Sequence, residues 1–184
     1  MKRIGPRAAL AVATVAVLCA ASAAVASVLS ASSASGGQIT FVNVTRQDLA
    51  ATTSSTTYVK VPGSGTRVTV TDGSDLILAR FSAESACYHA TPSTIGNWCS
   101  VRLVLYDQAT GLPVAELFPQ SGVDFAFDST DAGTEGSASW ESHSMDRSIR
   151  VGNGAYNVKV EWAVTSSNVV FRLDDWSLTV EKAT

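Results

Sequence analysis

Histidine and cysteine are scarce in this chain, which holds two histidines and three cysteines among 184 residues. Such a composition excludes a metal site built from three or more histidines. The sequence also lacks a Gly-x-Ser-x-Gly motif, which marks the nucleophile of α/β-hydrolases. Asp174 and Asp175 are adjacent, so a strand would turn them to opposite faces instead of pairing them for glycoside hydrolysis. We therefore expect a protein that is not an enzyme and requires no cofactor.

Basic side chains are also few, and they form no stripe or patch. Lys2, Arg3 and Arg7 lie at the N terminus and are three of the 13 basic residues. Removing this terminus would take none of the 16 acidic residues, so the formal net charge would change from −3 to −6. An acidic chain without a basic patch lacks the electrostatic surface that binds phosphate backbones, which excludes nucleic acid as a partner.

One long apolar run follows the basic start. It covers residues 8–29, is rich in alanine and valine, and ends in small residues. This order predicts a secretory signal peptide over residues 1–31, cleaved after Ala26 or Ala31, and hence a secreted, extracellular protein. A linker of small residues over 32–37 and a single domain over 38–184 would follow. The alanine-rich leader is typical of bacteria.

Two kinds of membrane attachment are alternatives to full secretion. An uncleaved leader would act as an anchor, although its alanine, serine and threonine content makes it a weak membrane span. A lipoprotein signal needs a small residue before its cysteine, and Leu18 precedes Cys19. We therefore expect no lipid anchor, and the domain lies outside the membrane whatever the fate of the leader.

Cys87 and Cys99 are the two cysteines of the domain, with eleven residues between them. An even number of cysteines in an oxidising compartment predicts a disulfide. Closing a loop of this length stabilises a fold by about 3 kcal/mol in the chain-entropy account. The alternative is a zinc site with His89 and His143, but Cys-x-His is not a usual ligand spacing for zinc.

Alternation of apolar and polar residues replaces helical periodicity after the leader. About eight short runs with turn sequences between them predict an all-β fold, an antiparallel β-sandwich or jelly roll of about eight strands. Residues 62–65 and 108–114 are predicted turns, 46–57 a loop, and 123–128 a short strand. The side chains expected to face inward are Ile77, Ala79, Phe81, Ala83, Cys87, Cys99, Val101, Leu103, Leu105, Tyr156, Val158, Val160, Trp162 and Val164, with Asn157, Lys159 and Glu161 facing outward.

The last predicted strand changes phase in its middle. Phe171 and Leu173 share one parity, whereas Trp176 and Leu178 share the other. One extra residue is needed to keep both sets on the inward face. The sequence therefore predicts a β-bulge at Asp174-Asp175.

The orientation of Glu141 and His143 depends on the regularity of their strand. In a regular strand they project from the inward face, about 7 Å apart. A bulge near Asp146-Arg147 would instead turn both to solvent and Trp140 inward. We favour the second interpretation, a polar strand that leads into a turn at Gly152–Gly154.

The Glu141–His143 pair invites comparison with the metal site of cupins. That motif places two histidines two positions apart, followed by a glutamate and a further histidine on a later strand. Here the order is Glu-x-His, and His89 is the one remaining histidine. The ligand count therefore argues against a cupin-type metal site.

Carboxylates gather in the segment after residue 122. Asp124, Asp128, Asp131 and Glu135 are interspersed with glycine, and hard oxygen donors suit Ca²⁺. The spacing differs from that of an EF-hand loop. A structural calcium ion is one hypothesis, and a solvated acidic loop is the alternative.

Aromatic residues mark a candidate binding surface. Tyr88, His89 and Trp98 lie within or beside the loop that the disulfide would close, and Trp140 lies near a strand start. A pinned loop with such side chains is a reasonable ligand surface, to which Glu141 and His143 would add polar groups. The alternative is that Trp98 and Trp140 cap the sandwich.

Two short stretches resemble known jelly rolls. The C-terminal stretch VVFRLDDWSLTVEK is similar to the closing strand of galactose-binding-type domains, including many carbohydrate-binding modules. That resemblance implies a structural calcium ion held by Asp174 or Asp175. The stretches LILARFSAES, CSVRLVLYD and GAYNVKVEWAV resemble core strands of TNF-like jelly rolls. Both resemblances imply a secreted jelly-roll family more than a specific function.

Three functions remain as hypotheses. The first is a non-catalytic module that binds a carbohydrate or another cell-envelope component. The second is a TNF-like homo-oligomer, in which exposed strand residues such as Val104 and Tyr106 would meet a partner subunit. The third is an envelope hydrolase, which no motif supports.

Overall fold

The computed structural model describes residues 33–121 and 125–184. The predicted signal peptide and Asp124 therefore lie outside the described residues. Within them the single helical segment is a 3₁₀ turn at Asp131–Gly133. No helix in these two ranges has the length and hydropathy needed to cross a membrane.

The described chain is built from antiparallel strands that hydrogen-bond in the order β1-β8-β3-β7-β4-β5, with β2 added to β8 and β6 to β4. This arrangement confirms the all-β prediction. The strands are β1 (Ile39–Gln47), β2 (Ala51–Thr53), β3 (Val59–His89), β4 (Trp98–Asp107), β5 (Pro113–Glu116), β6 (Asp128–Ser129), β7 (Glu141–Val164) and β8 (Val169–Ala183).

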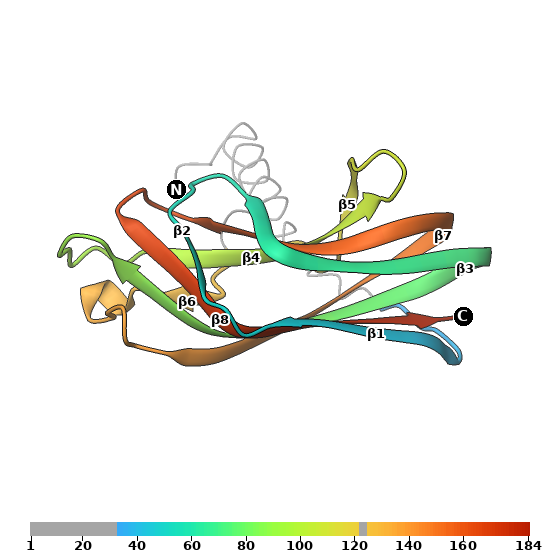
Figure 1. Cartoon of the computed structure of the whole chain (residues 1–184), viewed down its shortest axis with the longest axis horizontal. Coiled ribbons are helices and arrows are strands. Elements are labelled where there is room, and N and C mark those ends of the chain that lie inside the picture. The colour runs from blue at the N-terminus through green and yellow to red at the C-terminus, as the bar shows by residue number, and fades with distance from the viewer. Residues whose placement is uncertain (1–32, 122–124) are drawn as a thin grey trace, which may run out of the picture. The chain divides into compact units, whose positions relative to one another are not determined.

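Strands β3 and β7 each belong to both layers of a sandwich. The first half of β3 pairs with the second half of β7, and the second half of β3 pairs with the first half of β7. Between the halves both strands fold back, at the right of Figure 1. One layer therefore contains β1, β8 and the paired segments 74–85 and 141–152, and the other contains segments 59–70 and 154–164 with β4 and β5. This strand order is that of a jelly roll.

Glycine makes the fold-back possible, and we call the segments 71–73 and 152–154 the corner. Gly73 has a φ of +103°, a conformation that side chains with a β-carbon rarely adopt. Its N–H donates to Oδ1 of Asn153 at 2.8 Å, which ties the two bends together. The prediction that the strand ends in a turn at Gly152–Gly154 is therefore wrong, because β7 continues through the corner and stays paired with β3 on both sides.

Residues 62–65 form a bulge within β3 and not the predicted turn. The β3–β7 register shifts between Lys60 and Gly65. Ser64 compensates for the interrupted ladder, because its buried hydroxyl donates to the carbonyl of Val61 at 2.8 Å and accepts from the N–H of Val160 at 3.2 Å. A hydroxyl thus replaces a backbone partner at this position.

The core lies between the two layers and confirms the predicted alternation. Ring contacts cross the sandwich, as between Trp162 and Phe171 at 5.7 Å. The predicted disulfide is also confirmed: Cys87 in β3 and Cys99 in β4 are joined, with their Cα atoms 5.9 Å apart. The inward set that is buried comprises Ile77, Ala79, Phe81, Ala83, Cys87, Cys99, Val101, Leu103, Leu105, Val158, Val160, Trp162 and Val164, and Tyr156 packs partly against it.

The predicted bulge in β8 is confirmed. The register with β3 shifts opposite Ala83, between the pairs Ser82–Ser177 and Glu84–Asp174. Asp175 has a φ of 41° and forms the bulge. Leu173 and Trp176 are consequently both buried despite their opposite parity.

Two local predictions are wrong because they depend on distant pairing. Ala51–Thr53 lies in the expected loop but pairs with β8 as β2. Of the expected strand over 123–128, residues 125–127 are outside any strand and Asp128 pairs with Cys99. The residues themselves have weak strand patterns, so a neighbouring strand decides their conformation.

We predict that Gly73→Ala lowers the free energy of unfolding by about 1–3 kcal/mol, because alanine is strained at this φ. A β-carbon at Gly73 would contact nothing within 4 Å, so the cost is one of backbone conformation alone. Gly96→Ala is the matched control, since Gly96 has equal space and no left-handed φ. Urea unfolding measures both variants, and equal stability of the two would contradict the role of Gly73.

Candidate functional site

The predicted binding residues gather at the end of the sandwich farthest along the strands from the corner. We call this end, formed by residues 84–100, 127–143 and 164–173, the disulfide end. Strand β3 finishes here at His89, whereas β4 and β7 start here at Trp98 and Glu141. Ser85 pairs with Glu141 across β3 and β7, so residues far apart in sequence become neighbours.

Hydrogen bonds connect the loops of the disulfide end. The backbone of Asn97 donates to Oγ1 of Thr130 at 3.0 Å, and the backbone of Thr130 donates back to the Asn97 carbonyl at 2.9 Å. Thr165 Oγ1 donates to Oδ1 of Asn97 at 3.1 Å. Gly133 lies so close to Ser93 that a β-carbon there would collide with its carbonyl oxygen. Three loops therefore support each other at this end.

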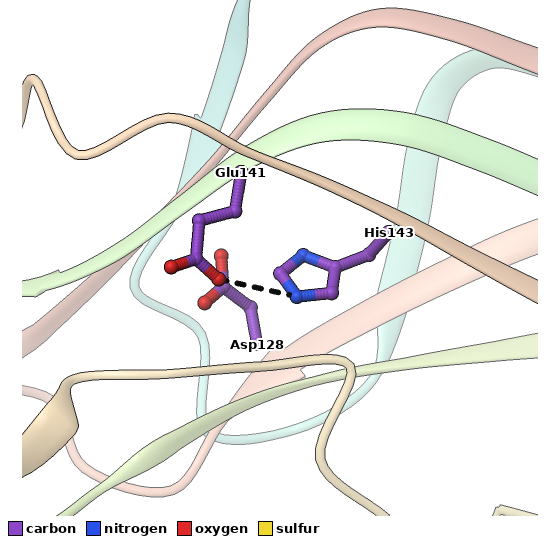
Figure 2. Close-up of side chains that lie close together, drawn as sticks. All are labelled: Asp128, Glu141 and His143. Atoms are coloured by element: carbon purple, nitrogen blue, oxygen red, sulfur yellow. Dashed lines mark ion pairs between the residues drawn. The ribbon is translucent and has the colours of Figure 1, made fainter.

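Asp128, Glu141 and His143 form a compact cluster at the disulfide end, which we call the Asp–Glu–His cluster (Figure 2). One ligand atom from each residue lies within 4.8 Å of the others. His143 Nε2 is 3.3 Å from Glu141 Oε2. Asp128 is buried at 7% exposure, while the side chains of His143 and Glu141 are 29% and 56% exposed. The cluster thus extends from the interior to the surface.

The β3–β7 register explains why Glu141 and His143 lie beside Asp128. It runs without a shift from the Ser74–Gly152 pair to the Ser85–Glu141 pair. The bulge expected near Asp146-Arg147 is therefore absent from this stretch. His143 is turned toward the interior, against the favoured interpretation, whereas Glu141 remains largely exposed. His143 lies on the same face as buried Met145, with its ring 5.5 Å from that of Phe127.

Ser85 links two members of the cluster. Its fully buried hydroxyl lies 2.6 Å from Asp128 Oδ2 and 3.0 Å from His143 Nδ1. A serine has one hydroxyl proton, and a carboxylate can only accept. Ser85 therefore donates to Asp128 and accepts from the Nδ1–H of His143. This order differs from a nucleophilic triad, in which histidine lies between serine and aspartate and the serine is open to substrate.

The carboxylates proposed for calcium do not assemble among the described residues. The side chain of Asp131 accepts from its own loop residue Thr134, and Asp174 lies 3.8 Å from Arg172. Asp175 is exposed on the bulge of β8. Asp128 joins Glu141 and His143 instead, so its partners differ from the predicted ones.

The aromatic candidates are half-buried around the same end. Trp140 lies beneath Arg172, whose guanidinium is 4.3 Å from the ring centre. The indole Nε1 of Trp98 is buried without a hydrogen-bond partner among the described residues. His89 Nε2 lies 3.2 Å from the side-chain amide nitrogen of Asn97. Tyr88, the last residue but one of β3, is half-buried. These side chains combine a capping role with partial exposure.

A second polar cluster, which the sequence did not indicate, lies on the outer face of β4 and β7. Val104 and Tyr106 are only 4% and 5% exposed, which corrects the prediction of a free oligomerisation face there. Strand β5 pairs with β4 at Val104 and Tyr106 and extends the sheet beside them. Glu161, expected outward, is buried beside them and accepts hydrogen bonds from the Tyr106 hydroxyl and from Arg102 Nε, the latter at 2.8 Å.

Burial, together with the hydrogen bond to Glu161 and the negative charge of that carboxylate, raises the pKa of Tyr106 to about 12, although the positive charge of Arg102 acts in the opposite direction. The Nζ atoms of Lys60 and Lys159 lie 4.5 and 5.0 Å from the Tyr106 ring centre. Arg102 neutralises Glu161 from 2.6 Å. The cluster is fully satisfied internally, so a structural role explains it.

No protein-family model matches the chain. A comparison with curated proteins also finds no match. The roles of Ser85, Asp128, Glu141 and His143 are therefore derived from their own distances and burial.

We predict that stability falls between about pH 10 and about 12 in part because of Tyr106. In the unfolded chain a tyrosine loses its proton near its ordinary pKa of about 10, whereas folded Tyr106 retains it up to about pH 12. The unfolded state therefore binds fewer protons in this window, and the free energy of unfolding decreases as pH rises. Denaturant unfolding at several pH values should show a smaller decrease in Tyr106→Phe. An identical decrease in both proteins would contradict the assignment.

Proposed function

We propose that this chain is a secreted, non-catalytic binding module whose disulfide end binds a carbohydrate or another cell-envelope polymer. The observation that carries the proposal is the convergence of Tyr88, His89, Trp98, Trp140, Glu141 and His143 at that one end. Loops positioned by a rigid β-scaffold are the usual place for a ligand surface.

The chemistry of this end suits a neutral sugar polymer. Partly exposed indole rings offer apolar faces, while Glu141 and His143 offer groups that hydrogen-bond hydroxyls. The acidic net charge disfavours a polyanionic ligand. The hydrogen bonds among Asn97, Thr130 and Thr165 hold the surface in one shape, which lowers the entropic cost of binding.

The non-catalytic part of the proposal rests on Ser85. It is the serine closest to a histidine and a carboxylate in the cluster, yet it is fully buried and its proton is engaged by Asp128. A buried hydroxyl of this kind orients its neighbours and is not open to attack a substrate.

We predict that Trp98→Ala and Trp140→Ala weaken binding to a cell-envelope polysaccharide at least tenfold, which corresponds to about 1.4 kcal/mol. Retention on a panel of insoluble polysaccharides and purified cell walls identifies the ligand, and titration gives the affinities. Phe118→Ala is the matched control, since Phe118 is exposed and pairs with Ser148, outside the disulfide end. Equal affinity in all three variants, with unchanged melting temperatures, would contradict the proposed surface.

Secretion is tested by the mature N terminus. We predict that protein recovered from the culture medium of a bacterial host begins at Ser27 or Ser32, because cleavage follows Ala26 or Ala31. N-terminal sequencing and intact mass give the site. Intact protein confined to the membrane fraction would contradict secretion and favour the uncleaved anchor.

A further inference from the structure

We infer that Asp128, Glu141 and His143 bind one divalent transition-metal ion, for which zinc is the best match. Ser85 acts as a positioning residue for His143 and Asp128. Glu141 and His143 also belong to the proposed ligand surface, but the inference concerns the ion alone and is read out without any glycan.

The donor atoms have the separation that a shared ion requires. Two ligand atoms at about 2.0–2.1 Å from a tetrahedral zinc ion lie about 3.4 Å apart. His143 Nε2 and Glu141 Oε2 are 3.3 Å apart, and the donor atoms of all three residues lie within 4.8 Å of one another. A charge-assisted hydrogen bond would be shorter, about 2.7–2.9 Å. Glu141 is the exposed member, so its flexible side chain can close the remaining distance.

The tautomer of His143 provides an independent argument. The proton of Ser85 is directed to Asp128, so Nδ1 of His143 carries the hydrogen that Ser85 accepts. In the neutral ring Nε2 then presents a lone pair, and it faces the carboxylate of Glu141 at 3.3 Å. Two acceptors facing each other repel unless a proton or a metal ion lies between them, and a shared proton would draw the two atoms to about 2.7–2.9 Å. Metal-bound histidines are typically held in this way, with the distal N–H donated to a second residue.

The surroundings of the cluster favour a retained ion. Asp128 is buried, and it is further fixed by the backbone N–H of Ser129, which donates to Oδ1 at 2.7 Å. The ring of Phe127 lies beside His143 and shields that side. A buried carboxylate next to a second one is costly unless a positive charge compensates. A divalent ion would neutralise both carboxylates.

The donor set selects the class of ion. An imidazole nitrogen suits zinc and other late transition metals, whereas Ca²⁺ and Mg²⁺ are bound by oxygen donors. Three protein ligands leave one position of a tetrahedral zinc ion open. Because the Glu141 side is exposed, water or an oxygen atom of a ligand would occupy that position.

The inference is tested by titrating ZnCl₂ into the tag-free domain in a calorimeter, after the protein has been treated with EDTA and dialysed. We expect one zinc ion per chain, a higher melting temperature with zinc, and at least tenfold weaker binding in His143→Gln and in Glu141→Gln. Glu84→Gln is the matched control, because Glu84 is exposed on the opposite face of β3 and should bind zinc as the wild type does. Ser85→Ala should weaken binding by roughly 10–100-fold with all three ligands intact.

Several outcomes would overturn the inference. These are the absence of zinc binding by the wild type, undiminished binding in both His143→Gln and Glu141→Gln, loss of binding in His89→Gln but not in His143→Gln, or binding of Ca²⁺ in place of zinc. X-ray absorption at the zinc edge should show nitrogen and oxygen neighbours only, and a sulfur neighbour would assign the ion to reduced cysteines. Melting of each variant in EDTA separates loss of a ligand from loss of the fold.

Discussion

The continuity of β3 and β7 through both layers is the constraint on which the rest of the structure depends. Because the two strands stay paired on either side of the corner, the register in one layer determines the register in the other. A shift of one residue at the corner would exchange the inward and outward faces of four strand segments. Gly73 and the side chain of Asn153 fix that register at the bend. The position of Glu141 opposite Ser85 follows directly from it.

The disulfide end depends on a second long-range contact. Cys99 pairs with Asp128 and is bonded to Cys87, so one residue links β3, β4 and β6. This places Asp128 of β6 beside Ser85 of β3, although the two residues are 43 positions apart in sequence. The end therefore combines a covalent link, a short strand and a buried hydroxyl, and its polar groups are held in defined positions. Such preorganisation is what a binding site requires.

Local patterns predict much of the fold but little of the cluster. Alternation gave the buried faces of β3, β4 and β7, and the parity change in β8 gave the bulge at Asp175, because burial imposes a period of two on any strand. The corner was mistaken for a turn because Gly-Asn-Gly fits either. Asp128 was expected to bind calcium, and Glu161 was expected to face solvent. The residues next to them in sequence do not indicate which distant side chains will surround them. Tertiary pairing decides both.

The pairing of β1 with β8 has a consequence for when the domain can fold. Asn43 lies opposite Val180, and the N–H of Gly37 donates to the carbonyl of Thr184 at 2.7 Å. The β8 strand also lies between β1 and β3 in the sheet, so β1 has no strand to pair with until β8 is present. Contacts so distant in sequence form late and slowly, because the long intervening chain must first be closed into a loop. The layer formed by β1, β8 and β3 therefore closes only after residues 169–183 have joined it, whatever the order in which the other strands pair.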